Sequence, residues 1–103
     1  MLIQVNTDHN IEGREELVAR VEAVVEAAMS RFGDRITRVE VHINDENGAK
    51  ISGNDKRCMM EARLEHRRPT SVTNHAASVD AAVSGAADKL QRALESTLGR
   101  LGA

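Results

Sequence analysis

The chain has 103 residues, of which 41% are hydrophobic and 29% are charged, and its formal net charge at pH 7 is −2. This composition is typical of one folded domain, and it excludes both a disordered chain and a general polyanion binder, whose field would attract phosphate. The single cysteine excludes an internal disulfide, and no apolar run approaches the roughly 20 residues of a membrane span. We therefore expect one cytoplasmic domain over residues 1–103, without a signal peptide and without contact with a membrane.

The N-terminal part of the sequence predicts a strand, a helix and a second strand. Residues 1–5 alternate between apolar and polar side chains, as in a short strand. From about residue 12 to residue 32, apolar side chains recur every three or four positions, which indicates a long amphipathic helix that ends at Gly33. Residues 36–44 alternate again and predict a strand with one apolar face.

The C-terminal part predicts a hairpin, a short strand and a last helix. Residues 45–55 are rich in Asn, Gly, Ser and Asp, which is typical of a hairpin loop. Residues 57–68 alternate between charged and mostly apolar side chains, and residues 70–73 form a shorter strand after a proline. Asn74 is the expected N-cap of a helix that runs to about Leu98.

The predicted order of elements is strand, helix, three strands, helix. Two amphipathic helices can bury their apolar stripes only against the apolar face of the sheet. The sequence therefore predicts an α+β two-layer sandwich, with two helices on one face of a four-stranded, mostly antiparallel sheet.

The sequence shows no catalytic or metal-binding pattern. The four histidines lie in different predicted elements, and no histidine or cysteine pair has the spacing of metal ligands. The acidic segment 45–47 fails the EF-hand pattern because Ala49 stands where an oxygen ligand is needed. Cys58 falls on the apolar side of a strand, so we expect a buried, inert thiol. We expect no enzyme activity, cofactor or small-molecule substrate.

Basic side chains concentrate on the long third strand and on the last helix. The candidates for RNA binding are Lys56, Arg57, Arg63, Arg67, Arg68, Lys89 and Arg92. Two interpretations stay open, because the strand arginines would either contact phosphates or pair with Glu61 and Glu65 on a solvated face. The predicted sheet carries no aromatic side chain on which bases would stack, so recognition would depend on phosphate contacts and shape.

Three runs of residues resemble a known family. They are His9-x-Ile11-Glu12, Arg31-Phe32-Gly33-x-x-Ile36-x-Arg38-Val39-Glu40-Val41, and Ala81-Ala82-Val83 followed by Asp88-Lys89-Leu90-x-Arg92-x-Leu94. With the predicted order of elements, they are similar to the short bacterial ribosome hibernation-promoting factors, also called ribosome-associated inhibitors or ribosomal subunit interface proteins. In the last helix, Asp80 stands where the family usually has Tyr.

The resemblance implies a fold related to the double-stranded-RNA-binding domain and a 30S subunit, through its 16S rRNA, as partner. It implies a non-catalytic factor that occupies the mRNA and tRNA channel and inhibits translation under stress or in stationary phase. In that role Lys89 and Arg92 would hold phosphates from the last helix, and the other five candidates from the sheet. The alternative is a divergent member that acts as a homodimeric protein-interaction module, and a third option is a general RNA chaperone.

Overall fold

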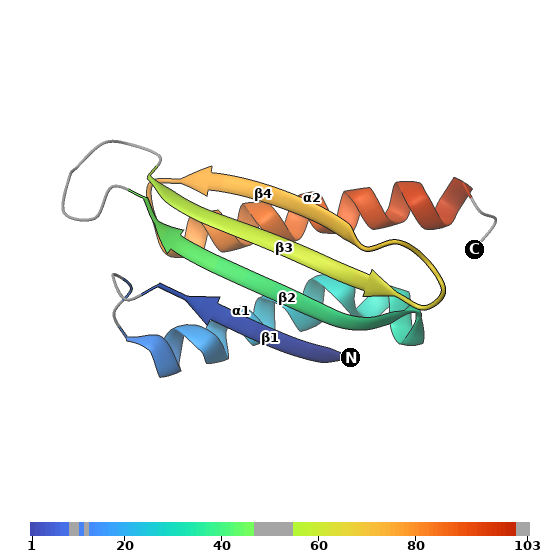
Figure 1. The fold of residues 1–103 in the computed structure, drawn as a ribbon, viewed down its shortest axis with the longest axis horizontal. Helices are drawn as coiled ribbons and strands as arrows, with labels where there is room; N and C mark the ends of the chain where they lie inside the picture. The colour runs from blue at the N-terminus through green and yellow to red at the C-terminus, as the bar shows by residue number, and fades with distance from the viewer. Residues whose placement is uncertain (9–10, 12, 47–54, 101–103) are drawn as a thin grey trace.

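A four-stranded sheet covered on one face by two helices forms the protein (Figure 1). The computed structural model describes residues 1–8, 11, 13–46 and 55–100, with only the backbone of Arg100. The elements in chain order are β1 (Leu2–Thr7), α1 (Arg14–Met29), the 3₁₀ helix η1 (Ser30–Arg35), β2 (Ile36–Asp45), β3 (Lys56–Leu64), β4 (Thr70–Ala76) and α2 (Val79–Arg100). The predicted order and fold class are confirmed.

The strands lie in the sheet in chain order. β1 pairs with β2 in parallel, whereas β2–β3 and β3–β4 are antiparallel. Parallel neighbours need a crossover connection, and α1 supplies it between β1 and β2. The sheet is therefore mixed and mostly antiparallel, as expected.

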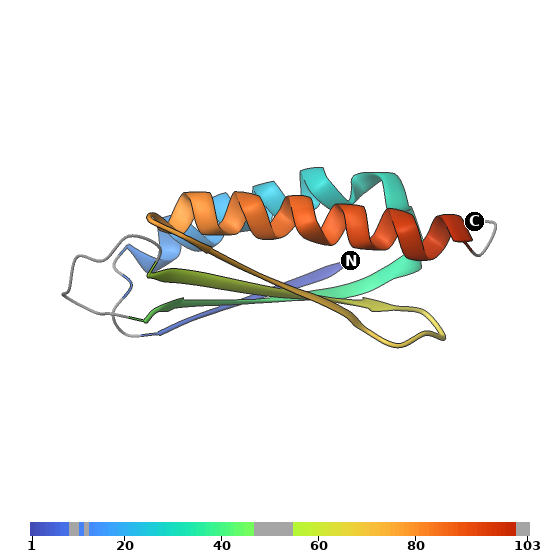
Figure 2. The ribbon, with the colours of Figure 1, turned by 90° about the horizontal axis from the view of Figure 1, so that it is seen from above.

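Both helices pack side by side on the same face of the sheet (Figure 2). α2 lies against β3 and β4, whereas α1 contacts β1 and α2. The opposite face of the sheet carries no helix, so its side chains face solvent. We call this opposite face the outer sheet face.

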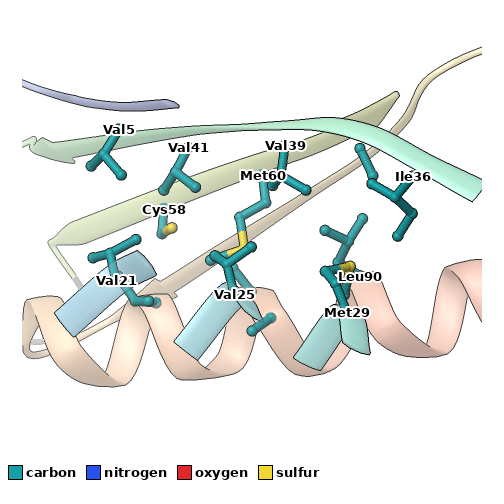
Figure 3. Packing of buried hydrophobic residues seen from close by; sticks show 14 of the residues in the cluster. Val5, Val21, Val25, Met29, Ile36, Val39, Val41, Cys58, Met60 and Leu90 are labelled. Carbon is teal, nitrogen blue, oxygen red and sulfur yellow. The ribbon is translucent and has the colours of Figure 1, made fainter. Parts of the chain in front are cut away.

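The core between the layers is aliphatic (Figure 3). In the strands, the alternate side chains that point toward the helices are almost completely buried: Val39, Val41, Ile43, Cys58, Met60 and Ala62. The helices contribute Leu17, Val21, Val25, Ala86, Leu90 and Leu94. The inward faces of β2 and β3 and the stripe of the last helix were predicted correctly, because a half-buried strand and a half-buried helix each impose their own period.

The first helix ends earlier than its hydrophobic pattern predicts. α1 stops at Met29, and the next residues form η1, in which Phe32 is still buried. The helix therefore does not reach the predicted stop at Gly33. Gly33 lies within η1 with φ 57° and ψ −133°, a conformation that residues with a Cβ rarely adopt, so the expected positive φ at this glycine is present. The predicted start, at residue 12, lies outside the described residues.

The prediction that Asn74 caps the last helix is wrong. β4 continues to Ala76, and Asn74 is a strand residue whose side-chain amide donates to the carbonyl oxygen of Ala82 in α2 (3.2 Å). Ser78 serves as the cap instead, because its Oγ accepts a hydrogen bond from the backbone N–H of Ala81 (3.1 Å).

The third strand is shorter than predicted. β3 ends at Leu64, and the chain then turns, with the backbone N–H of Arg67 donating to the carbonyl oxygen of Leu64 (3.4 Å). His66 has φ 62° in this turn and therefore does not continue the alternation of the strand. Of the hairpin loop expected between β2 and β3, residues 47–54 lie outside the described residues.

Candidate nucleic-acid interface

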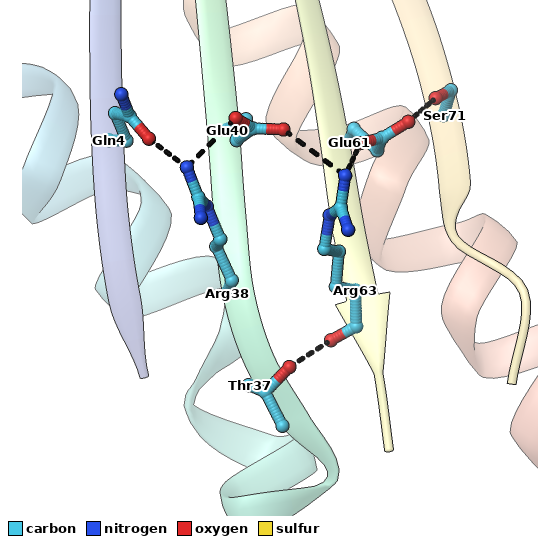
Figure 4. Close-up of polar contacts among 7 residues, drawn as sticks. All are labelled: Gln4, Thr37, Arg38, Glu40, Glu61, Arg63 and Ser71. Carbon is cyan, nitrogen blue, oxygen red and sulfur yellow. Dashed lines mark hydrogen bonds and ion pairs between the residues drawn. The ribbon is translucent and has the colours of Figure 1, made fainter. Parts of the chain in front are cut away.

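The middle of the outer sheet face carries a chain of polar contacts across all four strands (Figure 4). The strand register places Glu40 of β2 beside Glu61 of β3, and Arg38 beside Arg63. Arg38 donates to Gln4 of β1 and to Glu40 (3.0 Å). Arg63 lies 3.9 Å from Glu40 and 3.7 Å from Glu61. At the far edge, Ser71 of β4 donates to Glu61 (3.3 Å), which completes the chain.

These contacts neutralise Arg38 and Arg63 in the middle of the outer sheet face. Each guanidinium has a carboxylate within 4 Å, so a phosphate approaching Arg38 or Arg63 would also meet Glu40 or Glu61. Partly exposed ion pairs of this kind contribute little to stability. For Arg63 and Glu61, the structure therefore supports the solvated-face interpretation of the sequence, whereas Glu65 lies in the turn and pairs with His66 instead (3.4 Å).

Lys56 and Arg57 lie at the end of β3 that joins the β2–β3 connection. The Lys56 ammonium is 3.1 Å from Asp55 and 3.4 Å from Asp45, and its hydrogen bond with Asp55 raises its pKa above the usual 10.5. Arg57 faces outward beside His75 of β4 and has no carboxylate partner within the described part of the chain. Only Arg57 of this pair therefore has an uncompensated charge.

Arg67 and Arg68 lie at the opposite end of the sheet, in the turn between β3 and β4. Both are exposed, and neither side chain pairs with a carboxylate among residues 1–8, 11, 13–46 and 55–100. Arg35, at the end of η1, joins them, since its carbonyl oxygen accepts the backbone N–H of Glu65 (3.2 Å). Arg35 was not among the residues predicted from the sequence, because only the fold brings η1 beside this turn. We call Arg35, Arg67 and Arg68 the turn-end arginines.

The two helix candidates differ in their surroundings. The ammonium group of Lys89 donates a hydrogen bond to the backbone carbonyl oxygen of Thr73 in the edge strand β4 (2.9 Å). One of its donors is therefore already used within the protein. Arg92, one turn later, is exposed and makes no side-chain contact with a described carboxylate. Asp80, which departs from the family pattern, pairs with Arg20 of α1 (3.2 Å) and so joins the two helices.

The seven predicted residues lie in separate parts of the structure and do not form one cluster. Arg57 and Leu64 are seven residues apart on β3, which corresponds to about 23 Å at the rise of a strand. Lys56 and Arg57 are therefore far from Arg67 and Arg68. The seven residues therefore do not converge on one surface: Arg67 and Arg68 lie with Arg35 at the turn end, whereas Arg92 lies near the middle of α2 on its exposed side.

The rest of the described chain offers little reactive chemistry. Burial raises the pKa of the Cys58 thiol to about 12, so the thiol is protonated near neutral pH, as expected of an inert cysteine. Within the residues that the structure describes, no three metal-ligating side chains cluster, and no helix has the length and hydropathy to span a membrane.

Comparison with known proteins identifies the family. The sequence model described as sigma 54 modulation protein / S30EA ribosomal protein matches residues 3–101. The chain belongs to this family. The resemblance to ribosome hibernation and subunit interface proteins is thereby confirmed, although no curated protein sequence matches the chain significantly.

Two solved structures share the fold of this family member. The N-terminal domain of Thermus thermophilus Protein Y superposes with a TM-score of 0.73 at 18% identity, covering 94% of this chain and 99% of that chain. A ribosomal subunit interface protein from Coxiella burnetii superposes with a TM-score of 0.62 at 13% identity, covering 99% and 98%. At these identities the two structures support the fold alone.

Proposed function

We propose that this chain is a non-catalytic ribosome-associated factor. It binds the 16S rRNA of the small subunit in the channel that mRNA and tRNA occupy, and it inhibits translation under stress or in stationary phase. Its place of action is then the cytoplasm. The observation that carries the proposal is the match of nearly the whole chain, residues 3–101, to a family of ribosomal proteins.

The distribution of charge supports a local RNA contact. The turn-end arginines and Arg92 lack carboxylate partners in the described structure, so their charges are available to phosphates. Lys56, Arg57 and Lys89 remain candidate contacts, although Lys56 and Lys89 would first have to release their partners in the protein. Arg63, another residue predicted from the sequence, is neutralised by Glu40 and Glu61, so we expect it to contribute little to RNA binding.

Cosedimentation with purified ribosomal particles tests the proposal. We expect the protein to pellet with 30S subunits and 70S ribosomes at low salt, to be released as salt rises, and to compete with mRNA and tRNA. No pelleting above background at low salt would reject it. Equal affinity for free duplex RNA would instead indicate a general RNA chaperone.

Charge reversal on α2 tests the predicted helix contacts. Lys89→Glu with Arg92→Glu should weaken pelleting markedly, because two phosphate contacts become repulsions. Arg14→Glu is the matched control for Arg92→Glu alone, since Arg14 is an exposed arginine at the start of α1 and is not among the predicted contacts. Unchanged pelleting of the double variant would show that α2 is not part of the interface.

A homodimeric interaction module is the second candidate function. β1 is an edge strand without charged residues, and Met1 and Leu2 beside that edge are 51% and 59% exposed. An uncharged edge strand with apolar side chains can pair with the same strand of a second copy. A stable dimer in light scattering, together with no pelleting with ribosomes, would favour this function.

A further inference from the structure

A small cavity lies at the turn end of the molecule, where three elements meet. Its volume is about 220 Å³, and it is lined by Arg35, Leu64, Glu65, His66, Arg67 and Leu98. These residues come from the end of η1, the end of β3 with its turn, and the last part of α2. The cavity therefore lies among the turn-end arginines.

The lining combines an apolar floor with a cationic rim. Leu64 and Leu98 are each only 6% exposed, so they form the floor. Arg35 and Arg67 at the rim have no carboxylate partner in the described part of the protein. Glu65 is the one acidic lining residue, and it lies 3.4 Å from His66. The rim is thus positive even when His66 is neutral.

His66 is held in an unusual backbone conformation. Its φ of 62° lies in the left-handed region, which residues other than glycine adopt at an energetic cost. Among the described residues, no other non-glycine residue has a positive φ. Its imidazole is 88% exposed. Residues in such strained backbone conformations cluster at functional sites, where the surrounding structure maintains the strain.

We propose that this cavity accepts the base of one unpaired nucleotide, whose phosphate is held by Arg35 and Arg67. Proteins bind unstacked bases on histidine rings and on the planes of arginine guanidinium groups, and both line this cavity. Drug-sized ligands fill about 300–1,000 Å³, so this smaller cavity suits a single ring system. The inference rests on the proposed function and specifies single-stranded rRNA as its contact.

The test is an NMR titration of the free protein with uridine or adenosine monophosphate. We expect shifts of the Leu64 and Leu98 methyl signals and of the Glu65, His66 and Arg67 amides. Inorganic phosphate should leave the methyl signals unchanged. Unmoved methyl signals with either nucleotide would overturn the inference, as would identical shifts with phosphate alone.

Variants separate the base contact from the charge. His66→Gly removes the ring while fitting the backbone conformation, so nucleotide affinity should fall several-fold while the fold is kept. Arg67→Gln should weaken nucleotide binding about tenfold, because it removes a charge-assisted hydrogen bond. Glu65→Gln should strengthen binding, and Arg14→Gln, distant from the cavity, should leave it unchanged. Full nucleotide affinity in His66→Gly would contradict a bound base.

The outcomes distinguish this inference from the proposed function. Ribosome pelleting without nucleotide shifts would overturn the cavity inference and leave the proposed function standing. Nucleotide shifts without ribosome pelleting would overturn the proposed function and leave a nucleotide-binding cavity.

Discussion

The side chain of Asn74 in β4 lies directly against Gly85 of α2. A Cβ built on Gly85 would lie 2.1 Å from Nδ2 and 2.7 Å from Cγ of Asn74, so only glycine leaves room for this amide. The amide donates to the carbonyl oxygens of Ala81 and Ala82 and so fixes α2 against β4. Gly85 has a low helix propensity, but it allows the hydrogen bonds of Asn74 with α2.

Gly85→Ala should destabilise the protein by about 1–2 kcal/mol, because the Asn74 amide loses its hydrogen bonds, which outweighs a propensity gain of about 1 kcal/mol. In the Asn74→Ala background the same substitution should stabilise by about 0.5–1 kcal/mol, since only the propensity gain is left. Urea unfolding of the four proteins measures both effects. The same sign in both backgrounds would contradict the assigned contact.

Cys58 gives stability a dependence on alkaline pH. Its thiol ionises at about 12 in the folded protein and near 9.0 when unfolded, so the folded state keeps the proton longer. The contribution of this thiol to the free energy of unfolding is fully present below pH 9 and is lost as the pH rises toward 12. Between pH 8 and 10, the wild type should lose about 1.4 kcal/mol relative to Cys58→Ala. Parallel pH profiles of the two proteins in urea unfolding would show that the thiol is not buried.

At the scale of elements, the strands at the β2–β3 connection are tied together by charged groups. Lys56 of β3 bridges Asp45 of β2 and Asp55, while the backbone N–H of Asp45 donates to Asp8 after β1 (3.1 Å). Asp55 is 6% exposed and is buried only because an ammonium accompanies it. The contact orders the ends of three neighbouring strands.

Lys56→Met should lower the melting temperature more than Arg57→Met, because only the first substitution leaves buried carboxylates without a cation. The raised pKa of Lys56 keeps its contribution fully present below pH 10.5, and the contribution is lost as pH rises through the folded value. The gap between wild type and Lys56→Met should therefore close at the most alkaline pH. Equal melting temperatures of the two variants near neutral pH would contradict the role of Lys56.

The elements that the sequence predicted well are those with a clean period. β2 and β3 alternate because one face is buried, and α2 repeats leucines along one stripe. β4 was predicted too short because its side chains are mostly polar and half-buried. β3 was predicted too long because His66 keeps the alternation of residue types while its backbone turns. The backbone conformation of a single residue such as His66 does not change the pattern of apolar and polar residues, so the turn cannot be predicted from that pattern.

The candidate site was harder to predict than the fold. Seven basic residues were visible in the sequence, but whether each has a carboxylate partner depends on strand register and on loops that meet in space. The pairing of β2 with β3 brings Arg63 within 3.9 Å of Glu40, a residue on another strand, and the fold brings Arg35 to the β3–β4 turn. Neither relation can be read from spacing along the chain.

The whole protein has a net charge of −2, so RNA binding depends on where its unpaired cations lie. Carboxylates neutralise Arg38 and Arg63 in the middle of the outer sheet face. Arg57 at one end of β3, the turn-end arginines at the other end and Arg92 on α2 have no carboxylate partner in the described structure, so their charges are available to RNA. A chain with a net charge of −2 can then bind rRNA locally.

The salt dependence of 30S binding measures whether these unpaired cations contact phosphates. The slope of log affinity against log salt counts phosphate contacts, and each lost contact lowers it by about 1. Arg67→Gln with Arg68→Gln should reduce the slope by about 2, whereas Arg38→Gln with Arg63→Gln, the matched pair on the outer sheet face, should leave it nearly unchanged. A slope reduced by the outer-face pair and not by the turn-end pair would contradict the account.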